Sequence, residues 1–189
     1  MIISIGREAG SGGREMALKL SKRLNLEYVT QQKLIITADE MGFFEEVYSF
    51  CNEKPANTLL QAIAKNEVVS KNQQIVAMVF EELARRGSFV ILGRAANYFL
   101  RQRADFVSVF LHANFDFKLQ RLEAQGYSKE EAIEYMNRKD NQRASFNRYY
   151  TGEEWGKAKF YNLSIDTSKC GIDSSLEFII SFVNCAIKS

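Results

Sequence analysis

The sequence predicts an α/β fold in which helices cover both faces of a parallel sheet. Continuous apolar runs at Phe89–Leu92 and Phe106–Leu111 are typical of strands that are buried on both faces. Segments with apolar residues at helical spacing alternate with these runs, and this alternation is characteristic of a parallel sheet. The first strand-like run of the chain ends in a cluster of glycines that leads directly into a helical segment.

The amino-terminal half begins with a strand and then becomes mostly helical. Ile2–Ile5 is a β-branched run that predicts a strand, and Arg14–Leu24 has the spacing of a helix. Glu27–Val29 predicts a second short strand. Residues 31 to about 86 are helical in pattern and include the single proline, Pro55. We interpret this stretch as a helical insertion between two strands of the sheet.

Two helices are expected after the second buried run. Phe115–Ala124 has helical spacing, with Phe115 among the side chains that we expect to face inward. Ser128 and Glu131 form a capping-box pattern, in which each side chain satisfies a backbone N–H group of the first turn. This pattern predicts the start of a long helix that continues toward Tyr150.

The last elements are a strand at Leu163–Ile165 and a helix that Ser174 and Glu177 are expected to cap. Ligands of parallel α/β sheets bind at the carboxyl ends of the strands. Three segments follow strands directly: the glycine cluster, Gly93-Arg94 and residues 166–168. We therefore expect these three segments to meet at one edge of the sheet.

Length and composition predict one soluble domain that spans residues 1–189. The net charge of +2 gives no reason to expect a nucleic-acid or membrane partner. The three cysteines are widely spaced, so they predict neither a zinc site nor a disulfide framework. The chain shows no signal peptide and no long apolar run, so a cytoplasmic location is expected. The oligomeric state is left open.

The glycine cluster predicts a phosphate-binding loop. Glycines at positions 10, 12 and 13 allow the backbone to wrap closely around a ligand with several N–H groups pointing inward. The helix after the cluster adds the positive end of its dipole. The alternative is a plain strand-to-helix turn, for which a single glycine would suffice.

The cluster does not match the standard nucleotide-binding motifs. The dinucleotide pattern G-x-G-x-x-G/A fails because Glu15 stands at its last position. The Walker A pattern G-x-x-x-x-G-K-[ST] also fails when Gly12 is taken as its second glycine. Arg7 then stands at the first glycine, Gly13 at the lysine and Arg14 at the hydroxyl residue.

Five segments nevertheless resemble the cytidylate-kinase-like family, a branch of the P-loop nucleoside monophosphate kinases. Residues 7–14, REAGSGGR, resemble the GRE-x-GSGG-R opening of that family. The other four segments occur in the same order as in the family and span nearly the whole chain: 90–98, 109–113, 139–150 and 161–168.

This resemblance implies a P-loop NTPase, adenylate-kinase-like three-layer fold. It places a helical acceptor-binding insertion at about 31–87 and a lid at about 137–158. It further implies phosphoryl transfer from ATP to CMP or a related small acceptor, with Mg²⁺. The partners would then be small-molecule nucleotides. The alternatives are a non-catalytic nucleotide- or phosphate-binding module with a degenerate P-loop, or another phosphate-handling enzyme.

The resemblance also suggests roles for individual residues near the loop. Arg14 could replace the missing lysine, because a guanidinium can bind phosphate oxygens with two donors; alternatively, it is a solvated residue of the first helical turn. Arg94 matches a position that contacts the acceptor phosphate. The Ser/Thr that would bind Mg²⁺ in a Walker loop is absent, and Ser11 is the nearest hydroxyl to that position, so it is the one possible Mg²⁺ ligand that we name. The expected nucleotide- and phosphate-binding residues are Gly10, Ser11, Gly12, Gly13 and Arg94.

The expected lid contributes the remaining candidates. Asp140 shares the apolar helix face of Met136, so its carboxylate should be paired, with Arg143 as the local partner. Arg138 and Arg143 match lid arginines that embrace the transferred phosphate, although Arg138 could instead pair with Glu134 on the surface. The expected catalytic residues are Arg14, Arg138, Asp140 and Arg143.

The acceptor is not identified by the sequence. Ala95 stands where cytidylate kinases proper have an aspartate, and residues 28–33, YVTQQK, lack the acid that the family often has there. Both positions would read an acceptor base or ribose. His112 and Trp155 are expected to pack rather than to react.

Overall fold

The structure is a computed structural model that describes residues 1–52 and 67–187. Pro55 and the central part of the expected insertion lie outside the described residues. In chain order, the main elements are β1 (Ile2–Arg7), α1 (Gly13–Leu24), β2 (Glu27–Val29), α2 (Gln31–Glu40), α3 (Phe44–Cys51), α5 (Glu67–Arg86), β3 (Phe89–Leu92), α6 (Ala96–Phe99), β4 (Phe106–His112), α7 (Phe115–Glu123), α8 (Lys129–Thr151), β5 (Leu163–Asp166) and α9 (Thr167–Ala186).

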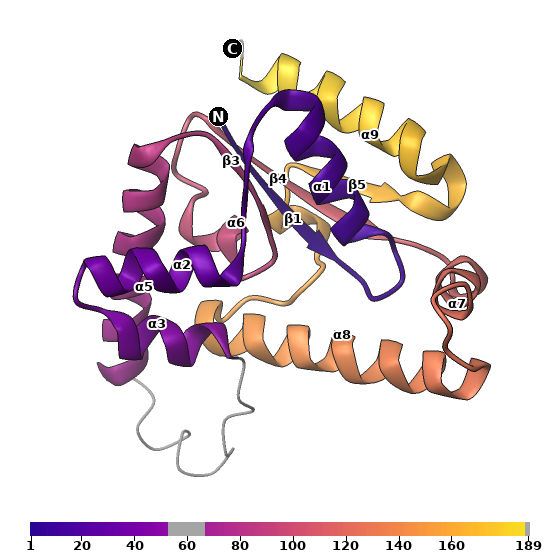
Figure 1. Ribbon diagram of the computed structural model, residues 1–189, viewed down its shortest axis with the longest axis horizontal. Coiled ribbons are helices and arrows are strands. Elements are labelled where there is room, and N and C mark those ends of the chain that lie inside the picture. Colours follow the sequence, from indigo (N-terminus) through magenta and orange to yellow (C-terminus); the bar gives the residue numbers. More distant parts are fainter. Residues whose placement is uncertain (53–66, 188–189) are drawn as a thin grey trace.

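The described strands form one parallel sheet of five, in the order β2-β3-β1-β4-β5. β1 lies at the centre and pairs with β3 on one side and with β4 on the other. All strands run the same way, so their carboxyl ends lie along one edge, which faces α8 in Figure 1. This arrangement confirms the α/β prediction.

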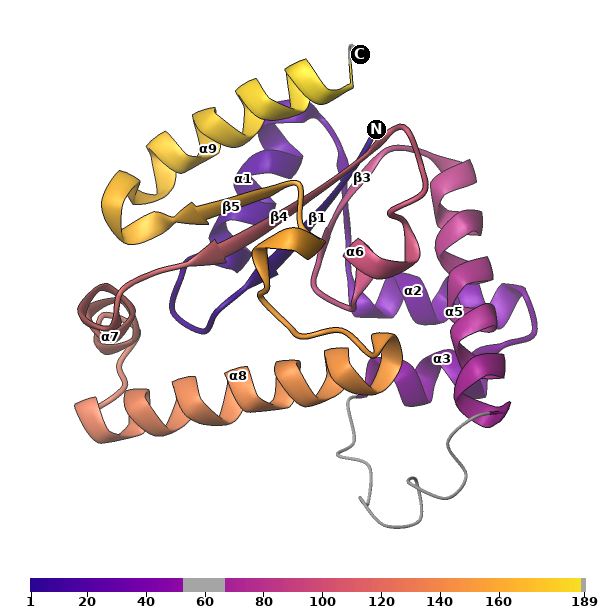
Figure 2. The same ribbon diagram turned by 180° about the vertical axis from the view of Figure 1, so that it is seen from behind.

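Helices cover both faces of the sheet, which gives the three layers that the sequence predicts. α1 and α9 lie on one face, and α2, α3 and α5 gather beyond the other side of β3 (Figures 1 and 2). Residues of β1 alternate between the two cores: Ile2 packs with the second group, and Ile3 and Ile5 pack against α1. Each fully buried side chain of this size contributes about 1.5–3 kcal/mol to the stability of the fold.

The carboxyl-terminal helix begins earlier than the sequence suggests. The capping pattern of Ser174 predicts its first turn, but α9 starts at Thr167, where the Asp166 carboxylate accepts a hydrogen bond from the Ser168 N–H at 3.0 Å. Gly171 then interrupts the helical backbone with a φ of 71°. The prediction was wrong because Ser174 lies inside the segment that continues after Gly171, while Asp166 caps a separate first turn before the kink.

The two middle helices start where the sequence predicts, with one error of orientation. The capping box of Ser128 and Glu131 is present at the start of α8. α7 is capped by Asn114, whose side chain accepts from the Phe117 N–H. Phe115 was expected to face inward, but 49% of its surface is exposed, because it occupies the first position of this helix, at the end of the packed face.

Within the described residues, no helix is both long enough and apolar enough to cross a membrane. α8 is long but carries charged residues along most of its length. It runs across the carboxyl edge of the sheet, next to the turn between β1 and α1 (Figure 1). The apolar residues that join it to that turn are Ala9, Leu122, Ala132 and Met136.

Candidate active site

The turn between β1 and α1 is a loop built around left-handed glycines. Gly10 has a φ of 80° and Gly12 a φ of 86°, a region that side chains with a Cβ rarely adopt. α1 begins at Gly13, and no side chain caps it. The first N–H groups of a helix have no partners within the helix, so this end of α1 presents donors to an anion.

The outer side of the loop is closely covered by α7 and α9. A Cβ added to Gly10 would lie 2.9 Å from the Lys118 Cβ and 3.0 Å from the carbonyl oxygen of the same residue. A Cβ added to Gly12 would overlap the side chain of Ile172. The glycines are therefore required by close packing as well as by backbone conformation.

Arg7 ends β1 and lies beneath the first residue of α1. A Cβ added to Gly13 would lie 2.5 Å from the Arg7 Cγ and 2.6 Å from its Cβ. A Cβ added to Gly93, at the end of β3, would overlap the Arg7 guanidinium. The Arg7 side chain thus occupies the space between the helix terminus and the carboxyl end of the neighbouring strand.

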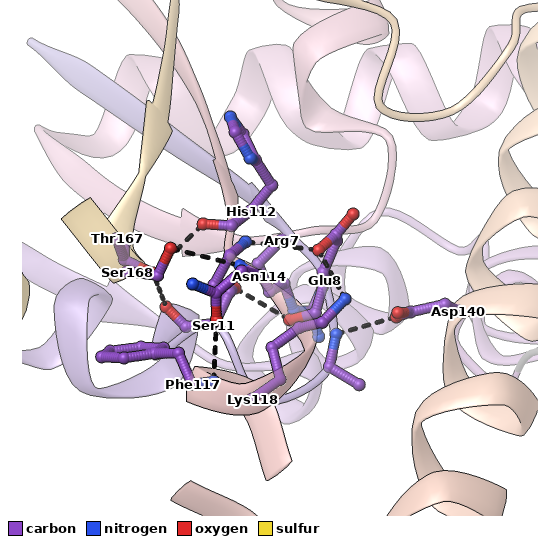
Figure 3. A network of polar contacts seen from close by, with 12 residues as sticks. Arg7, Glu8, Ser11, His112, Asn114, Phe117, Lys118, Asp140, Thr167 and Ser168 are labelled. Carbon is purple, nitrogen blue, oxygen red and sulfur yellow. Dashed lines mark hydrogen bonds and ion pairs between the residues drawn. The ribbon is translucent and has the colours of Figure 1, made fainter. Parts of the chain in front are cut away.

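Glu8, the next residue, connects the loop to the segment after β4. Its carboxylate accepts from the Lys118 ammonium at 2.9 Å and from the Ala113 N–H at 3.3 Å (Figure 3). Its own N–H donates to the Leu111 carbonyl. These bonds hold the first part of the loop against β4 and α7.

Asp140 of α8 binds the loop from the other side. Its carboxylate accepts from the Ala9 N–H at 2.8 Å and from the Arg143 guanidinium at 2.8 Å (Figure 3 shows the first bond). Arg143 also donates to the Arg7 carbonyl at 3.4 Å. The expected pairing of Asp140 with Arg143 is therefore present, and it fastens α8 to the loop.

Burial makes the Asp140 carboxyl group a weaker acid than usual. It raises the pKa of Asp140 above its ordinary value, and the negative charge of Glu8 acts in the same direction. The Ala9 N–H and the Arg143 guanidinium lower it, but by less than burial raises it. Side-chain exposure is 22% for Asp140 and 16% for Arg143, so the pair is largely shielded from water.

Ser11 and Thr167 join the loop to the start of α9. The Thr167 hydroxyl is completely buried and lies 3.0 Å from the Ser11 carbonyl and 3.1 Å from the His112 carbonyl (Figure 3). The Ser11 hydroxyl is also completely buried and donates to the Glu8 carbonyl at 2.9 Å. Its role is therefore internal to the loop.

The donors near the loop do not fit a Mg²⁺ ion held by the protein. Mg²⁺ is usually bound by one or two carboxylates or hydroxyls in addition to substrate phosphates. Here the Ser11 hydroxyl is turned inside the loop, and the carboxylates of Glu8 and Asp140 are each engaged by a cation. Within residues 1–52 and 67–187, no three acidic, histidine or cysteine side chains gather as a metal site.

The remaining predicted cations take different positions. Arg14 is in the first turn of α1 with an exposed side chain, and Arg138 is exposed on α8. Arg94 comes after β3 in a left-handed conformation, with a φ of 59°, and donates to the Gln31 side-chain oxygen at 2.9 Å. Ala95 shares this conformation, with a φ of 50°. Such backbone strain is common at ligand sites.

Sequence reasoning missed three residues that shape the loop, Arg7, Glu8 and Lys118, and expected Thr167 only as part of the segment 166–168. Strand alternation carried the signal for Arg7, because this residue has the same parity as Ile3 and Ile5 and so lies under α1. The others reach the loop through tertiary contacts. His112 contributes its backbone carbonyl to this network. Trp155 packs edge-on against Phe110, as expected for a residue that packs.

Comparison with known proteins places this geometry in a recognised group. The sequence pattern of the cytidylate kinase-like family matches residues 2–169. No curated protein matches the sequence.

Two solved structures share the fold. An uncharacterized protein from Eubacterium ventriosum is 24% identical with a TM-score of 0.73, over 97% of this chain and 98% of the other. The shikimate kinase from Bacteroides thetaiotaomicron is 13% identical with a TM-score of 0.52, over the same shares of the two chains. At these identities the likeness shows the fold, which is that of the P-loop NTPases.

Proposed function

We propose a phosphoryl-transfer function from one premise: the chain belongs to the cytidylate kinase-like family. In this proposal the protein transfers a phosphoryl group from ATP to CMP or to a related small acceptor. The turn between β1 and α1 is the phosphate loop, and α8 contributes the lid.

The observation that carries the proposal is the uncapped start of α1 behind left-handed glycines. Gly10, Gly12 and Gly13 bring backbone N–H groups together at a helix terminus, which favours phosphate over other ligands. Several of the side chains around this end are already fastened by bonds with carboxylates or carbonyls, so the cradle is preorganised. Preorganised donors stabilise charge in a transition state without rearrangement.

The acceptor is expected at the end of β3, next to the loop. Arg94 lies there in a strained backbone conformation, and its guanidinium reaches Gln31 at the start of α2. A cation in this position suits the phosphate of an acceptor monophosphate. Gln31 lies in the segment 28–33, where the family often has an acidic residue. In this chain the Gln31 amide would therefore contact the acceptor in place of a carboxylate.

In the proposed reaction, the protein positions two phosphate groups and neutralises their charge. The loop N–H groups hold the donor phosphates, and Arg143 on α8 faces the loop from across the cradle. Nearly all of the catalysis of phosphoryl transfer is positioning and electrostatic stabilisation. Mg²⁺ would enter bound to the nucleotide and neutralise part of its phosphate charge, without a ligand from the protein.

A non-catalytic nucleotide-binding module is the second candidate, and one observation favours it. Asp140 already accepts the Ala9 N–H in the loop, and its charge is opposite to the one that would help a phosphate. A protein in which α8 responds to occupancy, without turnover, would show the same contacts.

One assay separates the two candidates. ADP formation from ATP is measured with CMP, other nucleoside monophosphates and small hydroxylated acceptors, using Arg94→Ala and Arg143→Ala as variants. Turnover with one acceptor, lost in both variants, supports the transferase. Binding of ATP without turnover on any acceptor supports the binding module. If ATP and phosphate both fail to raise the thermal stability, neither function holds, because a ligand that binds the folded state must stabilise it.

A further inference from the structure

We infer that Arg7 supplies the cation of the phosphate loop, because glycine (Gly13) stands at the position where a Walker loop has its lysine. Its ligands would be the phosphate oxygens of the donor nucleotide, or of pyrophosphate. This inference rests on the proposed function, because it assigns a residue to the same phosphate site.

The first step is the placement of Arg7 by the alternation of β1. Ile3 and Ile5 face α1 and pack with its buried residues. Arg7 is two residues farther along the same strand, so its side chain rises on this face where α1 begins. The strand therefore delivers an arginine to the terminus at which the N–H groups point outward.

The second step is a steric exchange between positions 7 and 13. The stem of Arg7 fills the space where a side chain of residue 13 would start, as the 2.5 Å separation from an added Cβ shows. A lysine at 13 and an arginine at 7 cannot both be accommodated in this backbone. In the Walker pattern, position 7 is a glycine and position 13 a lysine. This chain has the reverse, so the glycine and the cation have changed places.

The third step concerns the direction of the guanidinium. It lies against Gly93, whose missing Cβ leaves room for it, and this places it between the loop and Arg94. On the other side of β1, the Tyr161 ring covers Gly6. Burial raises the pKa of Tyr161 to about 12, and the positive charge of Arg7 acts against this rise. The Arg7 guanidinium therefore lies at the carboxyl edge of the sheet, where both phosphates would lie.

A guanidinium in this position differs from the Walker lysine in what it can bind. It presents a planar array of N–H donors that matches two phosphate oxygens at once. Arg14, the residue expected from the sequence to replace the lysine, is exposed on the outer surface of the first turn. Arg7 is only partly exposed and packs against the first residue of α1, which makes it the better placed substitute.

The test compares Arg7→Met with Arg7→Lys. Met retains an unbranched apolar stem without the charge, and Lys retains both. Binding of pyrophosphate and of ATP is measured by titration calorimetry, with the melting temperature of each variant as a check on folding. We expect Arg7→Met to weaken binding by about 10- to 100-fold, as for the loss of one charged hydrogen bond. We expect Arg7→Lys to weaken binding by less than Arg7→Met does, because lysine keeps the charge but loses the paired donors of the guanidinium.

A purely structural role for Arg7 would give a different result. The Arg7→Met and Arg7→Lys variants would then bind pyrophosphate and ATP equally well after correction for their stabilities, and that outcome overturns the inference. If the wild-type protein binds neither pyrophosphate nor ATP, the proposed function is refuted and the inference with it. Normal wild-type binding with an unaffected Arg7→Met variant refutes the inference alone.

A second experiment tests the exchange of positions directly. Gly13→Lys alone should lower the melting temperature, because the new side chain meets the Arg7 stem. The double variant Arg7→Gly/Gly13→Lys restores the Walker arrangement at both positions. It should fold better than Gly13→Lys and bind pyrophosphate at least about 10-fold more tightly than Arg7→Gly. Binding no tighter than that of Arg7→Gly would overturn the inference.

Discussion

Removal of the Asp140 carboxylate should weaken the attachment of α8 to the loop and measurably destabilise the protein. In Asp140→Ala the Ala9 N–H loses its acceptor, and Ala9 is only 3% exposed. An unsatisfied buried donor costs about 1–3 kcal/mol, and loss of a hydrogen bond to a charged group costs about 1.5–3 kcal/mol. The side chain of Arg143 is 16% exposed and would lose its carboxylate partner.

One effect opposes these losses. Burial raises the pKa of Asp140, which means that the ionised carboxylate is costly to keep in this position. The variant no longer bears that cost, so the two losses do not add in full. We expect the free energy of unfolding to fall by about 2–4 kcal/mol. For a protein of this size that is a decrease in melting temperature of roughly 5–12 °C.

The assay is urea and thermal unfolding of Asp140→Ala, with two comparison variants. Asp140→Asn retains an acceptor for the Ala9 N–H and should lose less stability. Glu154→Ala removes another acid with a basic partner three residues away, Lys157, but that acid is 68% exposed. This control should unfold like the wild type. If Asp140→Ala also unfolds like the wild type, the carboxylate does not fasten α8 to the loop.

Three further changes test the packing and charges around the loop. Thr167→Val removes a buried hydroxyl and should lower the free energy of unfolding by about 1–2 kcal/mol in urea titrations. Gly12→Ala should lower the melting temperature more than Gly42→Ala, because both have positive φ but only Gly12 is crowded. The pKa of Glu15 lies below its ordinary value, chiefly because of the hydrogen bond from Arg121. The ionised Glu15 therefore stabilises the folded protein above about pH 4.3, and this stabilisation is lost as the pH falls through the folded-state pKa. Glu15→Gln should therefore flatten the pH dependence of unfolding below that value.

Much of the fold could be predicted because local patterns agreed with the tertiary structure. The buried strands Phe89–Leu92 and Phe106–Leu111 were recognisable since a central parallel strand is apolar on both faces. The capping box at Ser128 was equally local. The start of α9 was missed because Asp166 caps a short first turn before the kink at Gly171, and Ser174 lies inside the helix after that kink.

The site was harder to predict, since many of its contacts join residues far apart in the chain. The Asp140–Arg143 pair could be predicted because both residues share one helix face. The bond from Ala9 to Asp140 and that from Lys118 to Glu8 connect separate elements, so no local pattern indicates them. The room that Gly13 and Gly93 leave for Arg7 becomes visible only when the strands are placed side by side.

The bond between the Thr167 hydroxyl and the Ser11 carbonyl has a consequence for biosynthesis. It joins residues 156 positions apart, so the glycine loop meets this support only after Thr167 has left the ribosome. The central strand β1 is made first, but its partner β4 and the start of α9 are made much later. Such non-local pairing is slow, and the loop has its final surroundings only after β4 and the start of α9 have packed. A chain interrupted before Thr167 would contain every glycine of the loop and lack one of the bonds that hold it in shape.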